Sequence, residues 1–133
     1  MELKRVVVTG LGAVTPVGNT PEETWKNLLE GKSGAAPITH FDTTLFKTKF
    51  ACEVKDLNLN DYIDRKEVRK MDRYCQLAMV SAAQGIKDAG LDLEKEDLNR
   101  IGVVYGVGIG GIKTFQDEVV YYGQHEYQGP KFN

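Results

Sequence analysis

Three observations predict an α/β fold for this chain. Two short β-branched runs, residues 4–9 and 100–105, are each closed by glycine and are typical of strands buried on both faces. Amphipathic segments alternate with such runs, and the longest of them spans residues 65–89. The resulting order of strand, helix, strand, long helix, strand, glycine loop and helix is characteristic of an α/β chain.

The first helix is predicted from its capping residues. A glycine-rich loop, residues 10–18, follows the first strand and must turn tightly or approach a neighbour closely. Thr20 then suits the N-cap, Pro21 the first helical position and Glu23 the capping box. Gly31 is expected to end this helix.

The next part of the chain is less regular. Residues 32–47 carry turn chemistry and predict a loop, which Phe41 and Phe46 are expected to anchor to the body of the domain. Residues 50–54 alternate in polarity and predict a short strand at a sheet edge. An irregular turn is expected over residues 57–62.

We predict one continuous helix over residues 65–89, capped by Asp64 and ended by Gly90. Its apolar stripe consists of Val68, Met71, Cys75, Ala78, Met79, Ala82, Ile86 and Ala89. Most of these side chains are small, so the helix is expected to lie close against a neighbouring element.

The first two turns of this predicted helix carry five cations, where the helix macrodipole favours negative charge. The cations are Arg65, Lys66, Arg69, Lys70 and Arg73. They form either a solvated basic turn, balanced by Glu67 and Asp72, or a docking surface for an anionic partner. Spacing alone favours the solvated turn.

The C-terminal part of the chain is predicted to end in a helix and a loop. Residues 92–99 predict a helical turn, and residues 112–122 are amphipathic and predict a helix. Residues 123–133 show no periodicity and are expected to form a loop. We expect the chain to be part of a longer protein.

Composition and charge exclude several classes of protein. The chain has 133 residues, 41% of them apolar and 27% charged, as expected for a soluble globular domain. A net charge of −2 argues against non-specific nucleic-acid binding. No apolar run has the length of a membrane span, and the N-terminus has no signal-peptide pattern, so we predict a cytoplasmic protein that binds no membrane.

A dinucleotide-binding domain is one alternative, because Gly106, Gly108 and Gly111 satisfy G-x-G-x-x-G between a predicted strand and a predicted helix. The fit is local only. The acidic residue expected about 20 positions later falls on Glu126, in a loop bounded by glycine and proline rather than at a strand end. The sequence contains no P-loop motif either.

Few side chains suited to catalysis are present. Cys52 and Cys75 form no metal-binding or redox motif and are expected to be free thiols. Neither follows a sharp turn that would expose a nucleophile, and His40 and His125 lie in predicted loops. The residues alone therefore predict no catalytic residue, metal ion or cofactor.

Four segments, in chain order, resemble segments of a known protein family. They are RVVVTGLGAVTPVGNTPEETWKNLLEGKSG, HFDTTLFKTKFACEV, RKEVRKMD and RIGVVYGVGIGG. Together they closely resemble the N-terminal part of the β-ketoacyl-acyl-carrier-protein synthase II family, over nearly the whole chain. The resemblance implies a thiolase-like fold with αβαβα layers, of which residues 1–133 would form most of the N-terminal half. It also implies an acyltransferase of fatty acid biosynthesis, which condenses an acyl thioester with malonyl-carrier-protein and releases carbon dioxide.

The resemblance assigns roles to a few positions. Lys66, Arg69 and Lys70 match family positions that dock the acidic acyl carrier protein, which reverses the preference for a solvated turn. Ile109, between Gly108 and Gly110, matches the position that gates the acyl pocket, and glycines would let such a gate move.

The resemblance also implies what the chain lacks and how it assembles. The family's nucleophilic cysteine and catalytic histidines belong to motifs that are absent here, so the chain is expected to be inactive alone. The segment from Phe115 onward resembles the part that approaches the partner subunit of a homodimer. A non-catalytic relative, such as a chain-length factor that pairs with a true synthase, remains an alternative.

Overall fold

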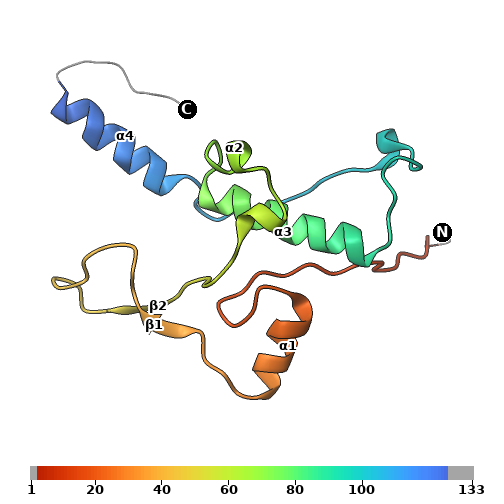
Figure 1. Cartoon of the computed structure of the whole chain (residues 1–133), viewed down its shortest axis with the longest axis horizontal. Helices are drawn as coiled ribbons and strands as arrows, with labels where there is room; N and C mark the ends of the chain where they lie inside the picture. The colour runs from red at the N-terminus through yellow and green to blue at the C-terminus, as the bar shows by residue number, and fades with distance from the viewer. Residues whose placement is uncertain (1–2, 126–133) are drawn as a thin grey trace.

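The computed structural model describes residues 3–125 and contains four α-helices, two 3-10 turns and one two-stranded sheet within that range. The elements are α1 (Pro21–Leu29), β1 (Ala35–Pro37), β2 (Phe50–Cys52), η1 (Leu59–Asp61), α2 (Arg65–Val68), α3 (Arg73–Asp88), η2 (Leu98–Arg100) and α4 (Ile112–Gln124). Helix α3 crosses the middle of the molecule, and α4 projects away from it (Figure 1). The arrangement is a partial α/β fold.

Helix α1 begins as its capping residues predict. The Thr20 hydroxyl accepts a hydrogen bond from the Glu23 amide at 3.2 Å, and the Glu23 carboxylate accepts one from the Asn19 amide at 2.7 Å. Gly31 follows the helix in the left-handed conformation, with φ +69°. The prediction of this helix from local sequence is confirmed.

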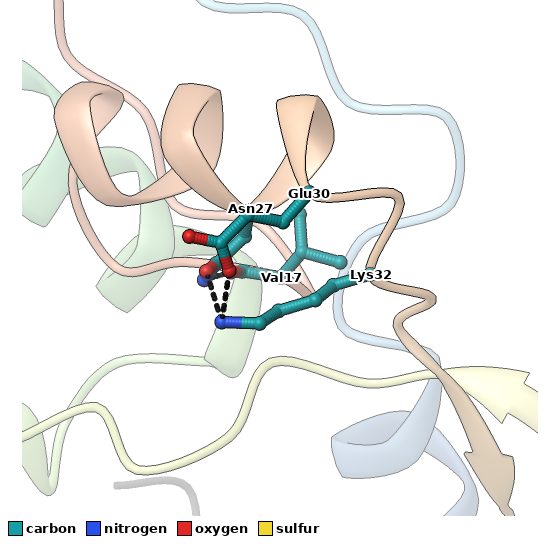
Figure 2. A network of polar contacts seen from close by, with 4 residues as sticks. All are labelled: Val17, Asn27, Glu30 and Lys32. Atoms are coloured by element: carbon teal, nitrogen blue, oxygen red, sulfur yellow. Dashed lines mark hydrogen bonds and ion pairs between the residues drawn. The ribbon is translucent and has the colours of Figure 1, made fainter.

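The C-terminal end of α1 is tied to the glycine loop by polar contacts, shown in Figure 2. The Lys32 ammonium lies 2.8 Å from both the Asn27 amide oxygen and the Glu30 carboxylate. The Asn27 amide nitrogen donates to the Val17 carbonyl at 2.5 Å. These bonds satisfy backbone and side-chain groups where the helix would otherwise fray.

The sheet consists of two short antiparallel strands. In their register Ala35 pairs with Cys52, Ala36 with Ala51 and Pro37 with Phe50. The strand predicted over residues 50–54 is therefore confirmed for its first part, whereas β1 lies in a segment predicted to be a loop. Pro37 hides this strand from sequence analysis, since proline is accepted only at an edge that does not need its missing N–H.

The long helix predicted over residues 65–89 is wrong as one continuous element. The chain forms α2 and α3, separated by a bend at residues 69–72. The Gln76 side chain fills the break, because its amide donates to the Val68 carbonyl at 3.0 Å and to the Met71 carbonyl at 3.1 Å. Periodicity missed the bend because the apolar spacing continues across it.

Helix α3 packs closely on the first glycine loop, as its small side chains predict. A Cβ atom placed on Gly12 would lie 1.9 Å from the Ser81 carbonyl oxygen, and one on Gly10 would lie 2.3 Å from that of Gly85. The face involved differs from the predicted stripe, since Val80 is fully buried whereas Met79 is 48% exposed. Glycine and serine contribute little apolar signal, so periodicity could not identify this face.

The two runs predicted to be buried strands form no strand here. Within the described part of the chain, no backbone hydrogen bond joins residues 4–9 or 102–105 to another segment, and the Val104 side chain is 100% exposed. A strand buried on both faces needs paired neighbours and covering helices, which the described residues do not supply. The accessible surface, 11480 Å², accordingly exceeds the roughly 7,000 Å² expected for a folded monomer of this mass.

The remaining predictions have mixed outcomes. Phe41 and Phe46 pack edge to face against each other at 5.4 Å and stay about half exposed, so the prediction that they anchor the loop to the body is wrong.

Helix α4 is confirmed and extends to Gln124, and residues 126–133 lie outside the described range. No helix in the described range is long and apolar enough to cross a membrane.

Candidate functional site

Helix α2 presents the cations that the sequence resemblance assigned to docking. Asp64 caps the helix by accepting a hydrogen bond from the Lys66 amide at 2.7 Å. The side chains of Lys66, Arg69 and Lys70 are all exposed. Arg65, the first residue of α2, is exposed as well, so a single turn of helix and the bend after it carry four positive charges at the surface.

The three cations differ in how their charge is balanced. The Lys70 ammonium forms an ion pair with the Glu67 carboxylate at 2.6 Å. Neither the Lys66 ammonium nor the Arg69 guanidinium makes an ion pair or hydrogen bond with another described residue. Of these three, Lys66 and Arg69 are therefore the charges most available to an anionic partner.

The break between α2 and α3 changes where the cations lie relative to the ends of the helices. Because α2 ends at Val68, Arg69 and Lys70 follow the C-terminal end of a helix, where the macrodipole favours positive charge. For Arg69 and Lys70 the expected conflict with the macrodipole is thus wrong, whereas Arg73 still lies in the first turn of a helix. Arg73 belongs to the next helix, where it begins α3 and donates to the Gln76 amide oxygen at 3.4 Å.

The second glycine segment, residues 106–111, is open at one end and held at the other. A Cβ atom on Gly106 or Gly108 would meet nothing within 4 Å. The Ile109 side chain is 77% exposed. A Cβ atom on Gly110, in contrast, would lie 2.8 Å from the Tyr74 ring.

The structure brings this segment against the bend that follows α2. The Thr114 hydroxyl, in the first turn of α4, donates a hydrogen bond to the Asp72 carboxylate. The pKa of Tyr74 is raised, first by its hydrogen bond and electrostatic interaction with Cys75 and then by burial and by the negative charge of Asp72. Sequence analysis assigned no role to Tyr74 or Thr114, and counted Asp72 only as a balancing charge.

The remaining candidate groups do not assemble into a catalytic site. Cys52 is exposed, Cys75 is half-buried and both are free thiols, as predicted. The His40 imidazole lies 3.8 Å from the Glu53 carboxylate, and the His125 ring stacks on Tyr121. No group of three or more possible metal ligands occurs among the described residues.

The helix after the G-x-G-x-x-G pattern does not offer an open anion site. In dinucleotide-binding folds a pyrophosphate binds at the N-terminus of this helix. Here the Asp72 carboxylate lies there, hydrogen-bonded to Thr114 and close to Gly111. A carboxylate in that position repels phosphate, which argues against the nucleotide-binding alternative.

Comparison with known proteins shows the class of protein. The family model described as "Beta-ketoacyl synthase, N-terminal domain" matches residues 3–131. The chain belongs to this family.

Several individual relatives within this family share one enzyme name. The chain is 47% identical, over 118 residues, to the 3-oxoacyl-[acyl-carrier-protein] synthase 2 of Synechocystis sp.. It is 48% identical to the enzymes of the same name from Staphylococcus aureus, over 113 residues, and Vibrio harveyi, over 116 residues. These alignments cover 85–89% of the chain but only 27–28% of each relative's length.

Two solved structures share the arrangement of the chain. The ishigamide ketosynthase/chain length factor matches with a TM-score of 0.61 and 39% identity, over 66% of this chain and 22% of that one. The AntDE:AntF structure, a type II PKS acyl-carrier protein in complex with its ketosynthase bound to the hexaketide, matches with a TM-score of 0.69 and 25% identity. That match covers 90% of this chain and 32% of the other.

Proposed function

We propose that this chain is the N-terminal part of a 3-oxoacyl-acyl-carrier-protein synthase of type II fatty acid biosynthesis. The complete enzyme would join an acyl thioester to malonyl-carrier-protein in a decarboxylative Claisen condensation, releasing carbon dioxide and lengthening the chain by two carbons. The observation that carries this proposal is the identity of 47% to a named synthase over 89% of the chain.

The fold proposed for the complete protein is thiolase-like, with αβαβα layers. The exposed β-branched runs at residues 4–9 and 100–105 support it, because they have the composition of central strands but lack paired neighbours here. We propose that residues 1–133 form most of the first half of that fold, with the rest of the protein completing the sheet.

Helix α4 is proposed to face a partner subunit of a homodimer. Its apolar side chains remain uncovered, with Ile112 61%, Phe115 71% and Val119 53% exposed. An apolar stripe of this kind on a projecting helix (Figure 1) fits the contact of a second subunit better than contact with water.

The role proposed for α2 is to dock the acyl carrier protein. Acyl carrier proteins are acidic, and charge pairing across an exposed rim acts mainly on the rate of encounter and on its salt dependence. Lys66 and Arg69 support this role because both are exposed and neither is paired with another described residue. The neighbouring structure of a ketosynthase with its acyl-carrier protein supports the same class of partner.

The double substitution Lys66→Glu with Arg69→Glu tests this role in the full-length protein. We expect it to weaken carrier-protein binding by about 1 kcal/mol or more per site and to flatten the dependence of binding on salt. Binding is measured by titration calorimetry at several salt concentrations. Lys47→Glu with Lys49→Glu, on the β1–β2 connection, makes the same change in charge elsewhere and should leave binding unchanged.

Activity toward a small thioester without the carrier separates docking from damage to the fold. It should be nearly unchanged in the docking variant. If the variant loses activity toward carrier-bound substrates and toward the small thioester equally, α2 is only a solvated helix end. Normal carrier binding at low salt would show the same.

A chain-length-factor-like subunit is the second candidate, because the ishigamide ketosynthase/chain length factor shares the fold at 39% identity. Such a subunit pairs with a true synthase and does not catalyse condensation. The presence of the nucleophilic cysteine in the full-length protein, tested by alkylation and mass spectrometry, distinguishes the two.

A further inference from the structure

Asp72 occupies the N-cap position of α3 but does not cap that helix. Its side chain makes no hydrogen bond to the first amides of α3. Instead its carboxylate accepts a hydrogen bond from the Thr114 hydroxyl, 42 positions away in the chain. A residue type that normally stabilises its own helix is thus used to hold a different one.

Helix α4 needs this outside group because its own N-cap offers none. Gly111 stands at that position with φ +69° and has no side chain that could cap the helix. The Asp72 carboxylate supplies negative charge at the positive end of α4. A Cβ atom on Gly111 would lie 2.9 Å from this carboxylate, so a larger residue would disturb the contact.

Tyr74 holds the preceding residue of the same segment. Its ring lies so close to Gly110 that an added Cβ atom would be 2.8 Å from the ring. Gly106 and Gly108 have no such neighbour. The segment is therefore anchored at Gly110 and Gly111 and unconstrained before Ile109, as a hinged gate would be.

We propose that Asp72 and Tyr74 are positioning residues for the acyl gate at Ile109. They lie in or just after the bend at residues 69–72, which also carries the docking cations Arg69 and Lys70. The bend therefore joins the carrier-docking face to the gate, so that acyl-chain selection depends on it. This inference rests on the proposed function, since Ile109 must act as the gate.

The test compares Tyr74→Ala with Tyr74→Phe in the full-length protein. Removing the ring frees the segment, so we expect the ratio of kcat/KM for a long acyl chain to that for a short one to rise about fivefold. Tyr74→Phe keeps the ring and should leave the ratio unchanged. Phe46→Ala, which removes an exposed aromatic ring from the β1–β2 connection, is the matched control and should also leave it unchanged.

Thr114→Val provides a second variant at an exposed position, where misfolding is not expected. It removes the donor to Asp72 and should raise the ratio in the same direction as Tyr74→Ala. An unchanged ratio in both variants, or an equal loss of rate for long and short chains, would overturn the positioning role.

Hydrogen exchange separates this claim from the proposed function. In Tyr74→Ala the Phe115 amide, which donates to the carbonyl of the anchored Gly111 at 2.9 Å, should exchange about tenfold faster than in the unmutated protein, and in Phe46→Ala it should not. This readout does not require condensing activity. An inactive unmutated protein would therefore refute the proposed function, whereas unchanged exchange would refute the positioning role.

Discussion

The two glycine segments look alike in sequence and differ completely in their surroundings. Gly10 and Gly12 lie against the backbone of α3, where added Cβ atoms would overlap carbonyl oxygens at 2.3 and 1.9 Å. Gly106 and Gly108 have nothing within 4 Å of the same position. Glycine in the first segment permits close packing, and glycine in the second permits backbone movement.

The contacts that hold the two segments differ in the same way. The first is bonded to α3 by the buried Gln84 and by Asp88, whose side chains accept from the Ala13 amide at 3.0 Å and the Leu11 amide at 2.8 Å. The second is held by Asp72 and Tyr74 at one end only. One residue type thus forms a closely packed loop in one place and an open segment in the other, according to what surrounds it.

The largest expected effect is that of Gly12→Ala. The new methyl group would overlap the Ser81 backbone, which cannot move without displacing α3. We expect the free energy of unfolding of the full-length protein, measured by urea titration, to fall by about 3 kcal/mol. A loss below about 1 kcal/mol would contradict the close packing of this loop.

Gln84→Leu should have the next largest effect. Gln84 is 9% exposed, accepts from the Ala13 amide and donates to the Asn19 carbonyl at 2.7 Å. Leucine keeps much of the volume but leaves both backbone groups unpaired, so we expect a loss of about 2 kcal/mol in the same urea titration. A variant as stable as the unmutated protein would show that these bonds do not hold the loop.

Gly108→Ala should have the smallest effect on stability. Its φ is not positive and an added methyl group meets no atom, so the free energy of unfolding should change by about 0.5 kcal/mol or less. Gly12→Ala, measured beside it, is the same substitution in the packed loop. A large loss of stability at Gly108 would remove the distinction between the two segments.

How far the sequence predicts the fold depends on how local each signal is. Helix α1 was predictable because Thr20, Pro21 and Glu23 act on their immediate neighbours. The break before α3 was not, although aspartate is a residue type favoured at N-caps, because the apolar spacing continues through Asp72. Residues 4–9 have strand composition but need partners that the described chain does not supply.

The candidate site was predictable only in part, for the same reason. The resemblance assigned docking to Lys66, Arg69 and Lys70; all three are exposed, and their role stays a prediction. The contact of Asp72 with Thr114 joins residues 42 positions apart, and neither position carries a sequence pattern that points to the other. Tyr74 likewise lies in a predicted helix, and no sequence pattern indicates that Gly110 packs against its ring.

The most direct test of the account is Ile109→Phe in the full-length protein. A larger, rigid side chain at the proposed gate should obstruct long acyl chains more than short ones, and we expect the ratio of kcat/KM for long to short chains to fall about tenfold. The ratio is measured with carrier proteins loaded with each acyl chain. An unchanged ratio would contradict the assignment of residues 106–111 as a gate.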